Sequence, residues 1–346
     1  MLEKEYLTSV RRKGMFLLGS IVILIILSFL FVMIGLDGGF GEIYYAVGAF
    51  LKHESLTVTQ KIILFLRFPR VIMAIFAGIG LGVSGAVMQS LSRNYLVSPF
   101  TLGISSAAAF GASVAIVFGA GTILETELGT IACAFLSSVL CIGIVFSIAQ
   151  RMGFQPVTIV LVGISLNYFF GAMTAMIEFF AKQHKLEAVV QWTFGTFNKA
   201  SWESIIVCGG ILLVCCFFLI RRSLQFDIIA ANEDEMVRSL GINPVRLRCV
   251  GGLLAVLMTA SIISFTGVIG FVGLISPHMT RLLVGVEHRF FLPLSGTIGA
   301  LLLLVSDTLG RLIIYPVNIP VGIVVSFLGV PLFLHLILSL HRKGVS

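Results

Sequence analysis

Apolar stretches long enough to cross the hydrocarbon core of a bilayer, about 20 residues each, recur along this sequence. The first begins at Met15, and further stretches follow to the end of the chain with only short polar segments between them. Of the 346 residues, 58% are hydrophobic and 11% are charged, whereas soluble domains usually carry about 25% charged residues. A water-exposed surface cannot be built from this composition. We therefore expect a single all-α integral membrane domain over residues 1–346.

The apolar runs predict about ten transmembrane helices in a compact bundle. They lie near residues 14–35, 69–91, 101–119, 128–150, 157–180, 202–221, 248–269, 271–286, 291–311 and 319–340. The run at 271–286 is short and contains Pro277, so we expect a kink or an incomplete crossing there. Two sets of five helices would enter the membrane in opposite orientations, as in the inverted repeats of many transporters.

The distribution of Lys and Arg predicts the orientation. With ten crossings, both termini lie on one side, and only eight of the 23 Lys and Arg residues fall on the other side: Lys52, Lys61, Arg67, Arg70, Lys182, Lys185, Lys199 and Arg311. Because positive charge accumulates on the cytoplasmic side, we expect both termini in the cytoplasm.

Several function classes receive no support from the sequence. The six cysteines lie in or beside apolar runs without C-x-x-C spacing, which argues against a zinc site or a disulfide framework. The net charge of +7 comes from scattered basic residues, so we expect no nucleic acid partner. The sequence contains no G-x-x-x-x-G-K-[ST] phosphate loop. We expect no metal site, no bound cofactor and no enzymatic activity of its own.

Small residues recur at four-residue spacing in two of the expected helices. Gly78 and Gly82 precede the run Ser84 to Ala86, and Gly103 is followed by Ala107 and Gly111. Such spacing lets two helix backbones approach closely, so it predicts helix–helix contacts at these positions.

A polar segment at about 221–248 differs from everything around it. Asn232 can cap a helix whose third residue is Glu235, Gly241 suits the C-terminal cap of that helix, and Pro244 can open the next one. We expect a compact helical loop on the cytoplasmic face. Its candidate partner-contacting residues are Asn232, Glu233, Asp234, Glu235, Met236, Val237, Arg238, Leu240 and Gly241.

This loop resembles the cytoplasmic coupling loop of the iron-siderophore, haem and cobalamin importer permeases, the membrane subunits of type II ABC importers. Other blocks resemble the same family in the same order: LRFPR at 66–70, SGAVMQSLSRNYLVSPFTLGISSAAAFGA at 84–112, GFVGLISPHMTRLL at 270–283, SDTLGRLI at 306–313 and NIPVGIVVSFLGVPLFLHLIL at 318–338. The resemblance runs from about residue 60 to the C-terminus. One departure is Tyr95, where the family usually has proline.

The resemblance implies a bacterial cytoplasmic membrane permease that pairs with a second, identical or paralogous permease. Two ATPase subunits, which use ATP and magnesium, would dock on the cytoplasmic loop, and a substrate-binding protein would dock on the other side. The family implies Arg67, Arg70 and Arg311 as receivers of acidic residues on that binding protein, because arginine forms two-point pairs with carboxylates.

The resemblance also implies a pathway beside residues 157–180, closed on the cytoplasmic side by gate residues Asn94, Tyr95, Leu96, Gln155 and Pro156. The segment at about 182–199 would form an external helical cap beneath the binding protein. The cargo would be a ferric siderophore or a related chelate such as haem or cobalamin. The alternative is a secondary transporter driven by an ion gradient, which would need buried titratable groups near the membrane midplane.

Overall fold

The structure, a computed structural model, describes residues 2–34, 39–52, 55–153, 155–314 and 316–342, and all regular elements in these ranges are helices. Each of the ten expected spans contains a helix: α1 (Leu2–Met33), α4 (Phe68–Ser92), α5 (Ile104–Phe118), α6 (Glu127–Arg151), α7 (Pro156–Phe180), α9 (Trp202–Arg221), α12 (Pro244–Thr266), α13 (Val272–Val284), α14 (His288–Leu312) and α15 (Val321–Arg342). The predicted all-α membrane fold is confirmed.

Not all ten helices are long enough to cross a bilayer unaided. Among the described residues, seven helical stretches have the required length and apolar character, and α5 is a shorter apolar helix. The 13 residues of α13, which include Pro277, rise only about 20 Å. This is less than the hydrocarbon thickness of about 30 Å, so the short crossing expected at 271–286 is confirmed.

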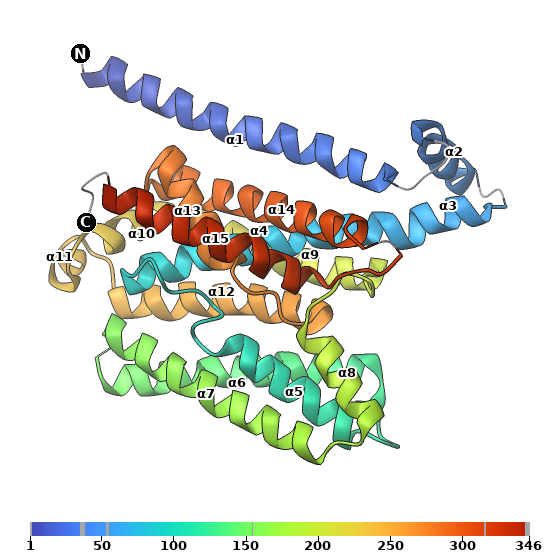
Figure 1. Cartoon of the computed structure of the whole chain (residues 1–346). Helices are drawn as coiled ribbons and strands as arrows, with labels where there is room; N and C mark the ends of the chain where they lie inside the picture. The colour runs from blue at the N-terminus through green and yellow to red at the C-terminus, as the bar shows by residue number, and fades with distance from the viewer. Residues whose placement is uncertain (1, 35–38, 53–54, 154, 315, 343–346) are drawn as a thin grey trace.

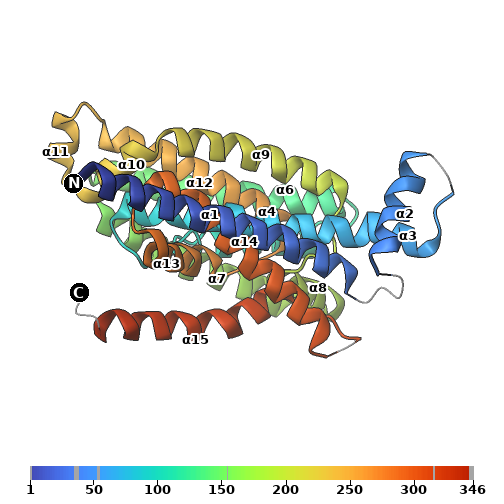
Figure 2. The same cartoon turned by 90° about the horizontal axis from the view of Figure 1, so that it is seen from above.

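The helices run side by side along one long axis (Figure 1). At one end, here called the terminal end, α1 begins and α15 ends, and α10 (Ser223–Ala231) and α11 (Asp234–Ser239) lie beside them (Figure 2). The opposite or distal end carries α2 (Gly39–Leu51), α3 (Val58–Ile62) and α8 (Gln183–Thr193). Both ends of the chain therefore lie on one side of the bundle.

Helix α4 is the centre of the bundle. In its most apolar window 78% of the residues are buried, against 11% for α1. A Cβ atom at Gly78 would collide with the backbone of Ala300 in α14, and one at Gly82 would collide with that of Ser295. The close contact predicted from these small residues is confirmed, and it determines how near α14 lies to α4.

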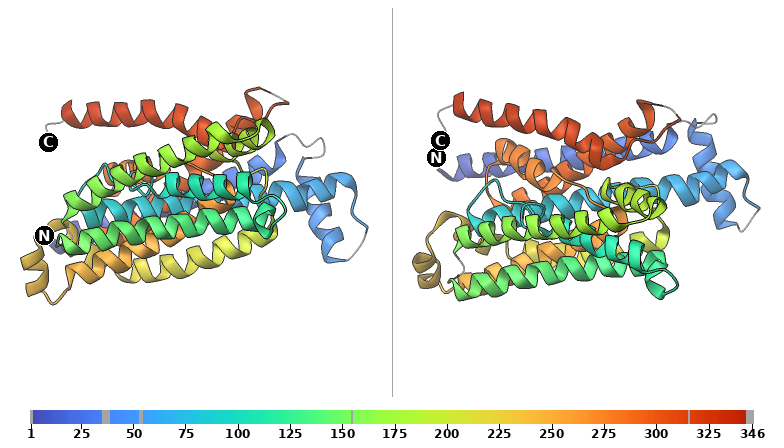
Figure 3. Two further views of the ribbon diagram at one scale, coloured as in Figure 1. Left: turned by 90° about the horizontal axis from the view of Figure 1, so that it is seen from below. Right: turned by 60° about the horizontal axis from the view of Figure 1, so that its bottom comes forward.

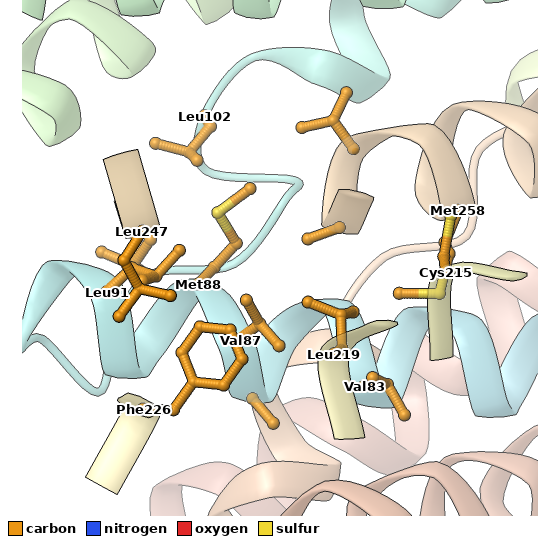
Figure 4. Close-up of a cluster of buried hydrophobic side chains, with 14 of the residues drawn as sticks. Val83, Val87, Met88, Leu91, Leu102, Cys215, Leu219, Phe226, Leu247 and Met258 are labelled. Carbon is orange, nitrogen blue, oxygen red and sulfur yellow. The ribbon is translucent and has the colours of Figure 1, made fainter. Parts of the chain in front are cut away.

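A large apolar cluster joins α4 to the helices that lead to the terminal end (Figure 4). Val87 and Leu91 of α4 pack with Leu219 of α9, Phe226 of α10 and Leu247 of α12, all of them buried. This cluster fixes α10 against the last turns of α4.

The outer helices expose large apolar side chains to their surroundings. Leu18 of α1, Leu136 of α6 and Leu213 of α9 are each more than 60% exposed. Exposed apolar surface on this scale is unfavourable in water but matches the acyl chains of a bilayer. The belt of exposed residues is thus the expected lipid-facing surface.

The distal end contains helices that the sequence analysis did not predict. Helix α2 precedes α3, which continues through one π-helical turn, η1 (Ile63–Arg67), directly into α4 (Figure 3). Pro69 supplies a physical reason for the irregular turn, because its ring removes one backbone donor and crowds the preceding turn. The continuous helix over 58–92 extends beyond the bundle and carries α2 with it.

Corresponding helices in the two halves share an unusual feature. The third helix of each set of five, α5 and α13, is short and starts after a residue with positive φ, Gly103 at 81° and Phe271 at 63°. The two helices run in opposite directions along the bundle (Figure 1). This correspondence agrees with an inverted arrangement of the two halves. A short helix, η2 (Ile123–Glu125), completes the fold between α5 and α6.

Candidate functional site

The polar segment at 221–248 folds into α10 and α11 at the terminal end. Helix α11 ends as its sequence predicts: Gly241 has a φ of 80°, its N–H donates to Arg238 O at 2.9 Å, and the N–H of Ile242 donates to Val237 O at 3.2 Å. These paired bonds form a Schellman cap, for which glycine is the preferred residue. Pro244 opens α12 behind the N-cap Asn243, so both of these predictions are confirmed.

The predicted role of Asn232 as the N-cap of α11 is wrong. The N-cap is Glu233, which makes no side-chain cap bond, while the Asn232 side chain donates from Nδ2 to Ile228 O at 3.0 Å. The reason is competition between two adjacent helix ends. Only two residues separate α10 from α11, and Asn232 satisfies a carbonyl in the last turn of α10.

The expected contact residues divide into an outer and an inner set. Glu233, Glu235, Arg238 and Gly241 are exposed, as are Met236 at 53% and Leu240 at 52%. In contrast, Val237 is fully buried. The prediction that Val237 offers an apolar contact to a partner is wrong, because its side chain already anchors α11 to the bundle.

Asp234 forms the inner anchor of α11 by accepting hydrogen bonds from two arginines. Arg248 of α12, only 1% exposed, donates from Nη1 to Asp234 Oδ2 at 2.6 Å and from Nη2 to Oδ1 at 2.8 Å. Arg93 donates from Nη2 to Oδ1 at 2.7 Å. The hydrogen bonds from Arg248, reinforced by Arg93, hold the pKa of the Asp234 carboxyl below its usual value. Asp234 is thus engaged within the chain and not simply offered to a partner.

The expected gate residues come together around one pocket. A cavity of about 590 Å³ is lined by Asn94, Tyr95 and Leu96 from the loop after α4, and by Pro156 and Val157 from the start of α7. Gln155 is the exposed N-cap of α7 beside them. The loop is held in shape by the N–H of Leu96, which donates to Asn94 Oδ1 at 2.9 Å. These two loops, 60 residues apart, meet at the terminal end only in the folded chain.

A second cavity of about 540 Å³ is also lined by Tyr95, and its lining includes Gln89, Arg93, Arg281 and His288. The guanidinium of Arg281 stacks on the Tyr95 ring, 3.7 Å from its centroid, and donates from Nη2 to Gln89 Oε1 at 3.2 Å. Such stacking of a cation on an aromatic face is attractive. Tyr95, the departure from the family pattern, therefore has a defined partner.

A buried polar contact links α10 to α14 and α4. Asp227 Oδ1 accepts from the backbone N–H of His288 at 2.9 Å and lies 2.6 Å from its Nδ1. The other ring nitrogen, Nε2, lies 2.5 Å from Ser90 Oγ. Asp227 thereby satisfies a backbone donor in the first turn of α14, where acceptors within the helix are absent.

The three arginines expected to face a binding protein lie together at the distal end, but they are engaged within the chain. Arg70 forms a two-point pair with Asp307, and Arg311 shares the same carboxylate at 3.5 Å. Arg67 donates from Nη1 to the carbonyls of Val32 and Ile34 at the end of α1. Because Arg70 and Arg311 share the single carboxylate of Asp307, these three side chains together carry one net positive charge.

The segment at 182–199 contains helix α8, and its Asn198 Oδ1 accepts a hydrogen bond from Arg70 Nη1 at 2.6 Å. Within the described ranges, no group of three or more His, Cys, Asp and Glu side chains is arranged to hold a metal ion. The six cysteines are free thiols.

Sequence reasoning missed Arg93, Arg248 and Asp307 as members of these clusters. The sequence places Arg93 at the start of the gate loop and Arg248 at the end of the polar segment, but it pairs neither of them with Asp234. Asp307 lies near the end of an apolar run, where the sequence predicts solvation by water, yet it is 3% exposed. For Asp307 the available signal is its place in an apolar helix, because a charged residue there needs a partner.

Comparison with known proteins agrees with this architecture. The sequence pattern of the FecCD transport family matches residues 18–339. The hemin transport system permease protein HmuU of Yersinia pestis is 33% identical over 80% of this chain and 83% of its own length. The iron-uptake system permease protein FeuC of Bacillus subtilis is 35% identical over 82% of this chain and 86% of its own.

A solved structure of a metal-chelate type ABC transporter in an inward-facing conformation superimposes on this fold with a TM-score of 0.82. It is 28% identical in sequence, and the match covers 93% of this chain and 98% of the other. Bundle, polar loop and distal arginines thus occur in a chain whose residues 18–339 match one family of membrane transport proteins. This chain belongs to the FecCD transport family.

Proposed function

We propose that this chain is the permease subunit of an ATP-binding cassette importer that moves an iron-siderophore or a similar metal chelate, such as haem or cobalamin, into the cytoplasm. The observation that carries the proposal is the match in fold to a metal-chelate type ABC transporter over 93% of this chain. The chain lacks a phosphate-binding loop, so ATP and its magnesium ion would be bound by separate subunits and the permease itself would catalyse no reaction.

In this proposal the terminal end faces the cytoplasm of a bacterial cell and α11 receives an ATPase subunit. The exposed Met236 and Leu240 supply the apolar part of the contact, and the exposed Glu233, Glu235 and Arg238 supply its charged rim. Helix α11 has only six residues, yet it is fixed to the bundle through Asp234 and Val237. A fixed handle transmits displacement to the membrane helices, whereas a flexible loop would not.

The distal end would face the substrate-binding protein. Arg70 and Arg311 carry a net positive charge there, and Arg67 lies in the same cluster. Acidic side chains on a binding protein would be attracted to this charge. The segment at 182–199, with α8, would form the cap below the binding protein.

The substrate would pass between two permeases, identical or paralogous, and leave through the pocket at Asn94 to Leu96 and Gln155 to Pro156. Movement of these two loops apart would open the pathway to the cytoplasm. An iron-containing cargo is favoured by the similarity to a hemin and an iron-uptake permease. We propose a ferric siderophore as the leading candidate.

Reconstitution tests the proposal. The permease is purified with its co-purifying ATPase and binding protein, placed in liposomes, and supplied with a radioiron-labelled ferric hydroxamate, ferric citrate or hemin. We expect uptake that requires ATP on the ATPase side and the loaded binding protein. Accumulation by the permease alone, driven by a proton gradient, would instead establish the secondary transporter and overturn the proposal.

A further inference from the structure

Arg93 occupies a position between the two functional elements of the terminal end. It follows the last residue of α4 and precedes the gate residues Asn94 to Leu96. Its backbone is left-handed, with a φ of 47°, a conformation that L-residues other than glycine, asparagine and aspartate seldom adopt. A residue held there must be fixed by its surroundings.

The side chain of Arg93 supplies that restraint. It donates from Nε to Ile229 O of α10 at 2.8 Å and from Nη2 to Asp234 Oδ1 of α11 at 2.7 Å. One guanidinium therefore joins the start of the gate loop to both helices of the polar segment, which lie more than 130 residues away in sequence. Charge-assisted bonds from a planar fork fix both direction and distance.

We infer that Arg93 is a positioning residue that couples α11 to the gate loop, so that displacement of α11 by its partner moves residues 94–97. The inference rests on the proposed function, because it assigns the residue through which the ATPase contact acts on the gate. Neither the family match nor the relatives' names assign Arg93 a role.

The elements on the α11 side are stiff enough to transmit a displacement. Arg248 donates two hydrogen bonds to the Asp234 carboxylate and a third, from Nε, to Leu91 O in the last turn of α4. Phe226 of α10 packs beside Leu91 in the apolar cluster of Figure 4. The polar segment, the end of α4 and Arg93 are therefore cross-linked at several points.

Tyr95, in the same loop, has a partner of a different kind. Tyr95 rests on the guanidinium of Arg281 in α13, and both Arg93 and Tyr95 contribute to the lining of two cavities. The loop thus borders both cavities. A stacked ring can slide or lift without a hydrogen bond being broken, whereas Arg93 is held by one hydrogen bond to Ile229 O and one to Asp234. The Tyr95–Arg281 contact is therefore the releasable side and Arg93 the fixed side.

The first test measures the tie in the permease alone, independently of transport. Backbone hydrogen exchange is compared for the unaltered chain, Arg93→Gln, Arg93→Lys and the control Arg12→Gln, which changes an exposed arginine of α1 at the same end. We expect exchange of residues 94–97 and 229–240 to rise at least tenfold in Arg93→Gln and less in Arg93→Lys. Unchanged exchange in both segments would overturn the inference.

The second test measures coupling in the complete importer. In a background whose six native cysteines are replaced by alanine, spin labels on Leu96→Cys and Leu161→Cys, which line the same cavity, report the separation of the gate loop from α7 with and without ATP. We expect Arg93→Gln to keep ATP hydrolysis within twofold, to lose at least nine-tenths of uptake, and to lose the ATP-dependent change in label distance. Arg12→Gln should match the unaltered chain, and Arg93→Lys should recover part of the uptake.

The outcomes distinguish the coupling role of Arg93 from the proposed function as an importer. Equal loss of hydrolysis and uptake in Arg93→Gln would overturn the inference, because it would indicate a damaged assembly and not a lost connection. Uptake and label movement equal to the unaltered chain would overturn it as well. If the unaltered importer shows no ATP-dependent uptake, the proposed function fails, while the exchange experiment on the permease alone still decides whether Arg93 ties the loop to α11.

Discussion

Asp307 of α14 forms a two-point ion pair with Arg70 of α4: Arg70 donates from Nε to Asp307 Oδ2 and from Nη2 to Asp307 Oδ1, both at 2.8 Å. The Asp307 side chain is only 3% exposed. The two residues are 237 positions apart in sequence. A buried carboxylate is stable only when opposite charges and hydrogen bonds compensate its lost hydration. This pair therefore fixes the distal ends of α4 and α14 to each other.

Replacing Asp307 should destabilise the bundle. In Asp307→Asn, Arg70 and Arg311 lose their shared carboxylate, and removing one partner of a buried pair costs about 3–5 kcal/mol. We expect a clearly lower thermal unfolding midpoint in lipid nanodiscs. Glu203→Gln, at an exposed position of α9 on the same end, is the matched control and should leave the midpoint unchanged. Equal midpoints for the two variants would contradict a stabilising role.

Arg311 allows the docking charge to be changed while the Arg70–Asp307 pair remains. We expect Arg311→Gln to weaken binding of the substrate-binding protein by about tenfold, since one charged contact at an interface is worth about 1–2 kcal/mol. The affinity is measured on nanodisc-embedded permease at low and high salt, and the difference should shrink at high salt. Arg12→Gln, which removes the charge of an exposed arginine at the opposite end of the bundle, serves as control. If Arg311→Gln bound the substrate-binding protein as tightly as the unaltered chain at both salt concentrations, Arg311 would not be part of the docking site.

The Asp234 anchor should make the polar segment sensitive to acid. Because Arg248 and Arg93 lower the folded-state pKa of Asp234, the unfolded segment binds the proton more readily, and stability rises with pH over the range between the two pKa values. The stabilisation is complete above the unfolded pKa of about 3.9. It is lost as the pH falls through the lower folded value.

Hydrogen exchange of residues 223–240 between neutral pH and pH 3 tests this dependence, after correction for the intrinsic pH dependence of exchange. We expect Asp234→Asn to exchange faster than the unaltered chain at neutral pH, with the gap closing in acid. A gap that stays constant with pH would mean that the carboxylate charge is not the source of the stabilisation.

Met236 and Val237 are neighbours with opposite expected effects. Met236 is 53% exposed and Val237 is fully buried. We expect Met236→Glu to reduce ATPase binding by about tenfold, corresponding to about 1.4 kcal/mol, without changing the stability of the permease. Val237→Ala should instead lower local stability by about 1–2 kcal/mol through loss of buried methyl groups. Binding is followed by titration with the purified ATPase, and stability by hydrogen exchange; identical profiles for the two variants would contradict the division of α11 into outer and inner faces.

Gly78 tests the contact between α4 and α14. A Cβ at this position would collide with the backbone of Gly299 and Ala300, whereas a Cβ at Gly143 of α6 would meet nothing within 4 Å. We expect Gly78→Ala to cost about 1–3 kcal/mol, as overpacking typically does, and Gly143→Ala to be neutral. The yield of monodisperse protein and its thermal midpoint provide the measurement. Equal behaviour of both variants would show that α14 can move away from α4 without loss.

Much of the local structure followed from residues close together in sequence. The ten helical spans, the short α13 with Pro277, the Gly241 cap and the Pro244 start each depend on fewer than about 25 consecutive residues. Helices α2 and α3 escaped prediction because, at 13 and 5 residues, both are too short to register as membrane spans. The Asn232 cap was assigned to the wrong helix because two helix ends compete for one side chain.

The apolar runs and the blocks of family resemblance by themselves determined that this chain is a multi-pass helical permease. A run of about 20 apolar residues is more stable in a bilayer than in water whatever helices lie beside it, so its position can be recognised from the sequence alone. Only the tertiary structure decided which charges meet: Arg93 with Asp234, Asp234 with Arg248, and Arg70 with Asp307. These pairs join segments from 14 to 237 residues apart. Their geometry depends on how closely α4, α12 and α14 pack, and backbone contacts at Gly78 and Gly82 set the distance between α4 and α14.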